Sequence, residues 1–348
     1  GIRMARASVR GRAGGADGAI QNTADDASGC KMSAVEKGYY KDDFIRFFVP
    51  KTIRRPPLIN RGYYSRVEAL RMLREQFLVA GGPEIKKQIV VLGAGLDTLY
   101  FNLKSQGRAP HGYFEVDFPE VTGVKSRIIG RNKELHQCFS NGADSVDTEA
   151  GTVTSADYSL IACDLRNLQG LEEKLAQAGL DFTIPTLFVS ECVLIYMSPE
   201  QGSALIEWVA KRFTAACFAT YEQIKPNDAF GQTMVSNLAE RGLSLASLSA
   251  FPGLAEQRQR YLDAGFGFSE ALDMDEIYSC VISLDERRRV DRLELFDEVE
   301  EWRLIQQHYC IVFASRDASS PEGRGLFSGY GLVKQTAPVI GGRALMVD

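Results

Sequence analysis

Histidine is scarce in this chain of 348 residues, and paired cysteine motifs are missing from it. The three histidines (His111, His136 and His308) lie far apart in the sequence. We therefore expect neither a catalytic centre built on histidine nor a bound metal. The seven cysteines form no CxxC motif and their number is odd. This pattern favours reduced thiols in a cytoplasmic or nuclear protein over a disulfide framework or a zinc site.

Long apolar runs and an excess of basic residues are also missing. No apolar stretch approaches the roughly 18–20 residues that a helix needs to cross a bilayer. The net charge of −5 argues against a general nucleic-acid-binding protein, which usually carries a basic bias. Hydrophobic residues make up 45% of the chain, which is enough for a sizeable core. We expect no membrane partner.

Apolar runs alternate with helical patterns along most of the chain. Strands alternating with helices of this kind indicate a mostly parallel sheet with helices on both faces. Near the end of the chain, the strands at 266–272 and 308–315 depart from strict alternation, and one strand is expected to run antiparallel at the sheet edge. Seven strands are predicted, at 88–92, 112–117, 158–163, 185–190, 216–221, 266–272 and 308–315. Helices are predicted at 168–178, 199–212 and 294–306.

The domain boundaries follow from composition. Residues 1–29 are rich in Gly, Ala, Arg and Asp and are expected to be disordered; their arginine-rich start fits a transit peptide or a cloning remnant. A single domain is expected over 30–316, and the Gly- and Ser-rich end, 317–348, is expected to be loose. Within the domain, 30–80 should form a helical lid, broken at Pro56-Pro57, and 226–265 a helical insertion for substrate.

The first strand carries the most specific local signal. It runs into Gly93-Ala94-Gly95, and two glycines at this point allow a sharp turn and a close approach to a ligand. In open α/β sheets, ligands bind outside the carboxyl ends of the strands. The sequence therefore predicts a nucleotide-like ligand above this turn.

Acidic residues follow several strands at the same predicted edge. Glu115 and Asp117 come about 20 residues after the glycines, where an acid can accept both ribose hydroxyls. Asp164, with the backbone N–H of Leu165, could read an adenine edge. Glu191 should lie near the middle of the sheet, close to the reacting part of the ligand.

These acids favour S-adenosylmethionine over NAD. The dinucleotide fingerprint prefers Gly or Ala where this chain has Thr98, and the adjacent Asp97 would repel phosphate. A sulfonium cofactor carries no phosphate and suits an acidic pocket. The pocket is predicted from Asp97, Glu115, Asp117, Asp164 and Glu191. An NAD-dependent enzyme remains the disfavoured alternative.

Several longer runs carry a family resemblance. They are Leu58–Arg66, Leu92–Thr98, Glu115–Pro119, Asp164–Arg166, Ser190–Tyr196, Tyr221–Gln223 and Asp228–Gln232. Together they resemble the leucine carboxyl methyltransferases, over about Asn22 to Arg316. The run Leu293–Trp302 is similar to the plant-type members.

The resemblance implies the class I S-adenosylmethionine-dependent methyltransferase fold, which is α/β and Rossmann-like. It implies methylation of the C-terminal leucine α-carboxylate of the protein phosphatase 2A catalytic subunit, giving an ester that regulates holoenzyme assembly. The partner would be that subunit, through its C-terminal tail and active-site face, and the enzyme would be a monomer. The cofactor residues that the resemblance implies are Lys31, Arg66, Gly93, Asp117, Asp164, Leu165 and Glu191; Gly95 belongs to the same turn.

Two alternatives stay open at this point. A sister branch of the family makes the tRNA base wybutosine and usually adds a C-terminal β-propeller of kelch repeats, which this chain lacks. Nucleic acid is expected as a partner only in that case. A catalytically silent module that binds the phosphatase is the second alternative.

The chemistry of a leucine carboxylate explains why histidine is not needed. Its pKa is near 3.5, so it is already anionic at neutral pH. Arg66 is predicted to receive it through a guanidinium fork, and Tyr196 to donate a hydrogen bond near the reacting centre. The segment around Lys31 is predicted to fold back over the cofactor, with the lysine at the methionine carboxylate.

Overall fold

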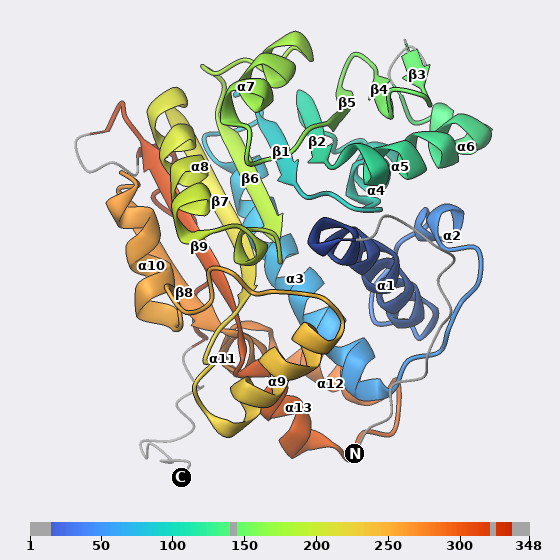
Figure 1. The fold of residues 1–348 in the computed structure, drawn as a ribbon, viewed down its shortest axis with the longest axis vertical. Coiled ribbons are helices and arrows are strands. Elements are labelled where there is room, and N and C mark those ends of the chain that lie inside the picture. Colours follow the sequence, from blue (N-terminus) through green and yellow to red (C-terminus); the bar gives the residue numbers. More distant parts are fainter. Residues whose placement is uncertain (1–14, 140–144, 321–324, 336–348) are drawn as a thin grey trace.

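The computed structural model describes residues 15–139, 145–320 and 325–335, and its strands form one sheet (Figure 1). Seven strands match the predicted ones: β1 (Gln88–Leu92), β2 (Gly112–Asp117), β5 (Tyr158–Ala162), β6 (Thr186–Glu191), β7 (Ala215–Gln223), β8 (Phe268–Asp273) and β9 (Tyr309–Asp317). Two short strands, β3 (Ser145–Asp147) and β4 (Thr152–Thr154), extend one edge. The order is β3-β4-β5-β2-β1-β6-β7-β9-β8. The sheet thus has nine strands among the described residues, where seven were expected.

Strand β9 corrects one detail of the predicted topology. It is antiparallel to β7, as expected of one strand, but it lies between β7 and β8 and not at the edge. Nearly every residue of β9 is buried. A strand this apolar is stabilised by a neighbour on each side, because an exposed apolar edge would invite aggregation. The parallel strands β5, β2, β1, β6 and β7 form the centre of the sheet.

Each face of the sheet buries its own hydrophobic core. Ile89 and Val91 pack in one cluster, with side chains of helices α3 (Pro57–Val79), α4 (Leu99–Ser105) and α5 (Pro119–Arg131). Val90 and Leu92 pack in the other, with α7 (Leu168–Gln177), α8 (Pro199–Arg212) and α10 (Leu254–Asp263). Successive side chains of a strand point to opposite faces, so an unbroken apolar strand such as β1 serves both layers.

The remaining helices lie around this frame. They are α1 (Ala16–Glu36), α2 (Ile45–Phe48), α6 (Lys133–His136), α9 (Ala229–Glu240), α11 (Met274–Glu276), α12 (Leu284–Asp291) and α13 (Val299–Gln306), with short turns η1 (Leu194–Tyr196), η2 (Ile277–Val281) and η3 (Gly325–Phe327). The Pro56-Pro57 break is confirmed, since α3 begins at Pro57. No helix of the described residues combines the length and the apolar character that crossing a bilayer requires.

Helix α1 corrects the expected disordered start of the chain. Residues 16–29, assigned to a tail, belong to this 21-residue helix, and Figure 1 shows it beside the strand ends. Alanine favours helix by its propensity. The helix packs on α3, and Ala34 and Cys30 are buried. Its tertiary contacts, which the composition does not show, therefore fix it; the arginine-rich residues 1–12 lie outside the described residues.

The predicted loose end of the chain is packed over 325–335. Phe327 stacks on Phe77 with ring centroids 5.7 Å apart, and its side chain is 1% exposed. The Tyr330 hydroxyl donates to the carbonyl oxygen of Phe218 in β7 at 2.9 Å. Residues 321–324 and 336–348 of that predicted tail lie outside the described residues.

Truncating Phe327 tests this packing. We expect Phe327→Ala to lower the free energy of unfolding by about 3–5 kcal/mol, because the change empties a buried aromatic site. Val333→Ala is the matched control, since Val333 is 76% exposed and should change stability by less than about 0.5 kcal/mol. Urea unfolding followed by circular dichroism measures both. Equal stabilities would show that this segment does not pack as described.

Candidate active site

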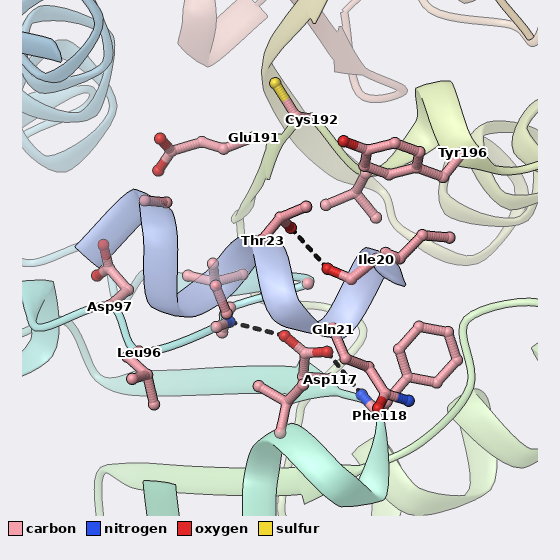
Figure 2. A pocket seen from close by; sticks show the side chains of 18 of the residues that line it. Ile20, Gln21, Thr23, Leu96, Asp97, Asp117, Phe118, Glu191, Cys192 and Tyr196 are labelled. Carbon is pink, nitrogen blue, oxygen red and sulfur yellow. Dashed lines mark hydrogen bonds between the residues drawn. The ribbon is translucent and has the colours of Figure 1, made fainter. Parts of the chain in front are cut away.

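A cavity opens at the carboxyl ends of β1, β2, β5 and β6, and helix α1 crosses it (Figure 2). The turn after β1 forms its floor, and the ends of β2 and β6 contribute side chains from either side. Of the predicted site residues, the cavity lining includes Lys31, Arg66, Gly93, Gly95, Asp97, Asp117, Asp164, Leu165, Glu191 and Tyr196. The structure therefore brings ten of the predicted residues together around one cavity.

The glycine turn needs both of its glycines. Gly93 and Gly95 have φ angles of +65° and +55°, in the left-handed region that favours glycine. A Cβ atom on Gly93 would lie 2.5 Å from Cγ2 of Val193. The backbone N–H of Gly95 donates to Oδ2 of Asp117 at 2.7 Å. The turn thus links the end of β1 to the acid at the end of β2.

Asp117 lies where the ribose acid was expected. Its Oδ1 accepts from the N–H of Phe118 at 2.7 Å, so each carboxylate oxygen is held by one backbone donor. Burial raises the pKa of Asp117 to about 6, although the hydrogen bonds from Gly95 and Phe118 act in the opposite direction. A buried carboxylate with remaining acceptor capacity is suited to two hydroxyl donors.

Four charged side chains form a network at the other end of the cavity. Nζ of Lys31 lies 3.1 Å from Oδ2 of Asp97 and 3.7 Å from Oε1 of Glu191. Nε of Arg66 donates to Oε2 of Glu191 at 2.5 Å. These side chains are 12–17% exposed. The network joins α1, α3 and the ends of β1 and β6.

The network keeps all four groups ionised. Burial alone would raise the pKa values of Asp97 and Glu191, but Lys31 beside Asp97 and Arg66 beside Glu191 hold both below their usual range. Burial opposes the charge on Lys31 too, yet Glu191 and Asp97 raise its pKa. Two cations and two anions therefore balance in a partly desolvated site.

The guanidinium of Arg66 packs against two aromatic rings. Its guanidinium carbon lies 4.5 Å from the ring centroid of Tyr221 and 5.6 Å from that of Tyr63. Tyr221 in turn stacks on Tyr309, with centroids 5.2 Å apart and ring planes 11° apart. Cation–π contacts of this kind hold a guanidinium in one orientation.

A second cavity shares a wall with the first. Arg66, Glu191, Cys192 and Tyr196 line both cavities, and so do Thr23 and Ala27 of α1. Beyond that wall the second cavity is lined by apolar and aromatic side chains, together with the polar Asp26, Gln223, Arg241 and Gln306. Its lining includes Leu58, Ile59, Tyr63, Tyr221, Leu238, Leu243, Ile305 and Tyr309. The two predicted catalytic residues, Arg66 and Tyr196, thus lie at the boundary between the two cavities.

Elsewhere in the lining of the first cavity, Arg166 bridges the end of β5 to α1. Arg166 binds Asp164 through Nη2 and Oδ2 at 2.6 Å and Asp17 through Nη2 and Oδ2 at 2.9 Å. Burial would raise the pKa of Asp164, but the hydrogen bonds from Arg166 lower it overall. Asp164 and Leu165 line this cavity, as predicted.

The prediction that Glu115 lines the cofactor pocket is not supported by the structure. Glu115 lines neither of the two cavities described above. Its side chain is fully buried, forms an ion pair with Lys125 and accepts a hydrogen bond from the Tyr158 hydroxyl at 2.7 Å. Asp117 ends the strand, whereas Glu115 sits two residues deeper in it. A ligand at the strand ends therefore meets only the second of these acids.

A family model described as leucine carboxyl methyltransferase matches residues 19–210. Leucine carboxyl methyltransferase 1 homolog from Arabidopsis thaliana is 43% identical over 317 residues, covering 91% of this chain and 93% of that protein. The chain belongs to the leucine carboxyl methyltransferase family. The resemblance predicted from the sequence motifs is thereby confirmed, and with it the methyltransferase fold class and a carboxyl methyltransferase as the class of enzyme.

Two further relatives show both branches of the leucine carboxyl methyltransferase family. Leucine carboxyl methyltransferase 1 from Bos taurus is 38% identical, covering 87% of this chain and 91% of that protein. tRNA wybutosine-synthesizing protein 4 from Homo sapiens is 45% identical, covering 86% of this chain but 44% of that protein. Identity alone therefore does not separate the branches.

The sequence reasoning missed the part of the site that α1 supplies before Lys31. Ile20, Ala24, Ala27 and Lys31 all line the first cavity. Their spacing of four, three and four residues places them on one face of a helix. This period was available in the sequence, but the surrounding Gly, Ala and Asp residues suggested disorder.

Substituting Gly93 tests the turn in this member of the family. We expect Gly93→Ala to lower the free energy of unfolding by roughly 1–2 kcal/mol for its positive φ and by a further ~1–3 kcal/mol for overlap with Val193. Gly179→Ala is the matched control, because Gly179 has a φ of +87° but no described atom lies within 4 Å of the position that its Cβ would take.

Chemical unfolding of both variants measures the difference. Val193→Ala added to Gly93→Ala should recover the overlap part of the loss and leave the conformational part. A Gly93→Ala variant no less stable than Gly179→Ala would contradict the close approach to Val193.

Proposed function

We propose that this protein transfers a methyl group from S-adenosylmethionine to the C-terminal leucine α-carboxylate of the protein phosphatase 2A catalytic subunit. The observation that carries the proposal is the position of Arg66, a cation shared by both cavities. One cavity would hold the cofactor and the other the acceptor. S-adenosylmethionine, when bound, supplies an electrophilic methyl group.

The residues of the first cavity fit this cofactor. Asp117 offers a carboxylate to ribose hydroxyls, and Asp164 with Leu165 offers polar groups to adenine. At the other end, Asp97 and Glu191 suit an ammonium and a sulfonium charge, while Lys31 suits a carboxylate. The balanced charges of the network match an amino-acid group that carries charges of both signs.

The acceptor needs orientation and desolvation. An α-carboxylate is ionised at neutral pH, so no general base is required. Because Nε of Arg66 is used by Glu191, the Nη donors suit a second carboxylate in a bidentate fork. Holding the reacting oxygen in line and excluding water can lower the activation barrier by up to roughly 7–11 kcal/mol.

The second cavity suits the rest of a C-terminal leucine. Leu238, Leu243 and Ile305 give it an apolar wall for an aliphatic side chain. Tyr196 is half-buried at the shared wall, and its hydroxyl would donate to the reacting carboxylate. Helix α1 would act as the lid over the cofactor, and the α9 region would guide the peptide tail.

The tRNA branch is the second candidate, favoured by the 45% identity to tRNA wybutosine-synthesizing protein 4. Both branches would use the same cofactor cavity, so the acceptor must be tested directly. Transfer of labelled methyl to purified phosphatase catalytic subunit, compared with tRNA lacking the last wybutosine steps, separates them. No transfer to either, with the cofactor bound, would favour a silent phosphatase-binding module.

The cellular setting follows the same proposal. Cys30, Cys163 and Cys310 are buried free thiols, which suits a reducing compartment. We therefore place the enzyme in the cytoplasm. The proposed function further implies a monomer that acts on the tail and active-site face of its phosphatase partner.

Replacing Arg66 tests the proposed carboxylate fork. We expect Arg66→Gln to lower methyl transfer by at least about 30-fold, since losing one partner of a buried charged hydrogen bond costs about 2–5 kcal/mol. Arg66→Lys should be intermediate, because it retains the charge but not the fork.

The matched control is Arg212→Gln. Arg212 is exposed and pairs with Glu172 at 2.8 Å, away from both cavities. Thermal unfolding of all three variants separates misfolding from lost catalysis. Near-normal turnover by a folded Arg66→Gln variant would overturn this assignment.

The raised pKa of Asp117 predicts a pH effect on cofactor affinity. Below pH 6 the carboxyl takes up a proton and loses acceptor capacity, so affinity should fall by up to about tenfold between pH 7 and pH 5. Calorimetric titration measures it, and Asp117→Asn should bind more weakly but with little change over this range.

Stability should respond to Asp117 in the opposite sense. The folded state takes up this proton at higher pH than the unfolded chain, so burial of the carboxylate destabilises the fold above pH 6. That penalty should fade as pH falls from about 6 toward about 4.

A cofactor affinity of the wild-type protein that does not change between pH 7 and pH 5 would contradict a role for the ionised carboxylate of Asp117.

A further inference from the structure

A buried ion pair lies on the face of β7 opposite to the second cavity. Tyr221 and Gln223 of β7 line the second cavity, and Glu222 between them points to the opposite face of the sheet because strand side chains alternate. There Oε2 of Glu222 lies 3.8 Å from Nη1 of Arg260, on α10, and the two side chains are 0% and 1% exposed. Neither residue lines the cavities described above.

Glu222 holds the turn that carries Tyr196. Its Oε1 accepts a hydrogen bond from the backbone N–H of Ile195 at 2.7 Å. Ile195 is the middle residue of η1, so Tyr196 follows directly on this anchored peptide. The bond is strongest when Glu222 is ionised, because hydrogen bonds to an ionised acceptor are roughly twice as strong as neutral ones.

Ser247 fixes the same turn from the other side. Its Oγ donates to the carbonyl oxygen of Leu194 at 3.0 Å, and its N–H donates to the carbonyl oxygen of Ile195 at 3.1 Å. Leu194, Ile195 and Ser247 are all fully buried. The backbone just before Tyr196 is therefore held at three atoms, one of them by Glu222.

A contribution to the stability of the fold does not explain why this ion pair is present. Burial raises the pKa of Glu222 to about 7, with Arg260 acting against that rise. Among the described residues, Nε, Nη1 and Nη2 of Arg260 find no hydrogen-bond partner. A buried pair with such incomplete partners is generally no more stable than two apolar side chains of similar volume.

The surroundings nevertheless form a slot for Arg260. Its guanidinium carbon lies 4.3 Å from the ring centroid of Phe251. Its Nη2 lies against Gly202 of α8 so closely that a Cβ atom there would overlap it. The arginine is thus held in place as the counter-charge of Glu222, from α10 across to β7.

We propose that Glu222, supported by Arg260, is a positioning residue for methyl transfer: it fixes the Leu194–Tyr196 turn so that Tyr196 faces the acceptor. The inference rests on the proposed function, because it assigns the acceptor to the second cavity. It explains why the run Tyr221-Glu222-Gln223 contains a buried acid between two residues that line that cavity.

The test removes the hydrogen bond between Glu222 and the N–H of Ile195 without leaving an unpaired buried charge. In the double variant Glu222→Leu/Arg260→Leu, both charges are replaced by apolar groups, so the fold should remain stable. The matched control is Glu222→Gln/Arg260→Gln, in which the amide oxygen introduced at position 222 can still accept from the N–H of Ile195. Thermal unfolding, cofactor affinity, kcat and the acceptor KM are measured for both.

We expect the leucine double variant to bind the cofactor within twofold of wild type and to lose at least tenfold in kcat with little change in KM. An interaction that acts mainly in the transition state produces this split. The glutamine double variant should keep kcat within about threefold. Unchanged kcat in the leucine variant, or equal losses in cofactor affinity and kcat, would overturn the proposal.

A double-mutant cycle with Tyr196→Phe shows whether the effect passes through Tyr196. We expect Tyr196→Phe to lower kcat in wild type but to have less than about a twofold effect in the leucine double variant, because coupled residues are non-additive. Equal effects in both backgrounds, or none in wild type, would overturn the proposal.

The outcomes also separate the inference from the proposed function. The kcat of each variant, relative to that of the wild type, is measured on whichever acceptor the wild-type enzyme methylates, phosphatase or tRNA. Transfer to tRNA alone would refute the phosphatase proposal while these relative kcat values still decide the role of Glu222. A wild-type enzyme that methylates neither would refute both.

Discussion

The four-charge network of Lys31, Asp97, Glu191 and Arg66 is the interaction on which the site depends. Its members come from α1, the turn after β1, the end of β6 and α3. Burying any one of them alone would be costly, because an unpaired charge loses its hydration without compensation. Each partner is therefore needed to keep the others in place. The network also links α1 and α3 to the ends of β1 and β6.

The same network gives the two cavities a common boundary. Arg66 and Glu191 belong to both linings, and the stacked rings of Tyr221 and Tyr309 support the guanidinium from below. A rigid cation at a boundary can orient a ligand on either side of it. This arrangement suits a transfer reaction, in which donor and acceptor must meet in one geometry.

The alternation of strand side chains distributes the remaining roles. In β7, Tyr221 and Gln223 line the second cavity, while Glu222 points to the opposite face of the sheet and holds the η1 turn. In β2, Asp117 reaches the cavity because it ends the strand, and Glu115 stays in the core with Lys125. A shift of one or two residues along a strand therefore separates a side chain that lines a cavity from one that is enclosed in the core.

The sequence by itself determined the seven main strands, the glycine turn and ten of the residues that line the first cavity. Those features depend on local pattern: apolar runs, positive φ at Gly93 and Gly95, and the rule that ligands lie at strand ends. Only the tertiary structure decided that 16–29 is helical, that β9 lies inside the sheet, and that Glu115 is enclosed. Each of these depends on which distant surface packs against the segment, and neither composition nor local periodicity records that.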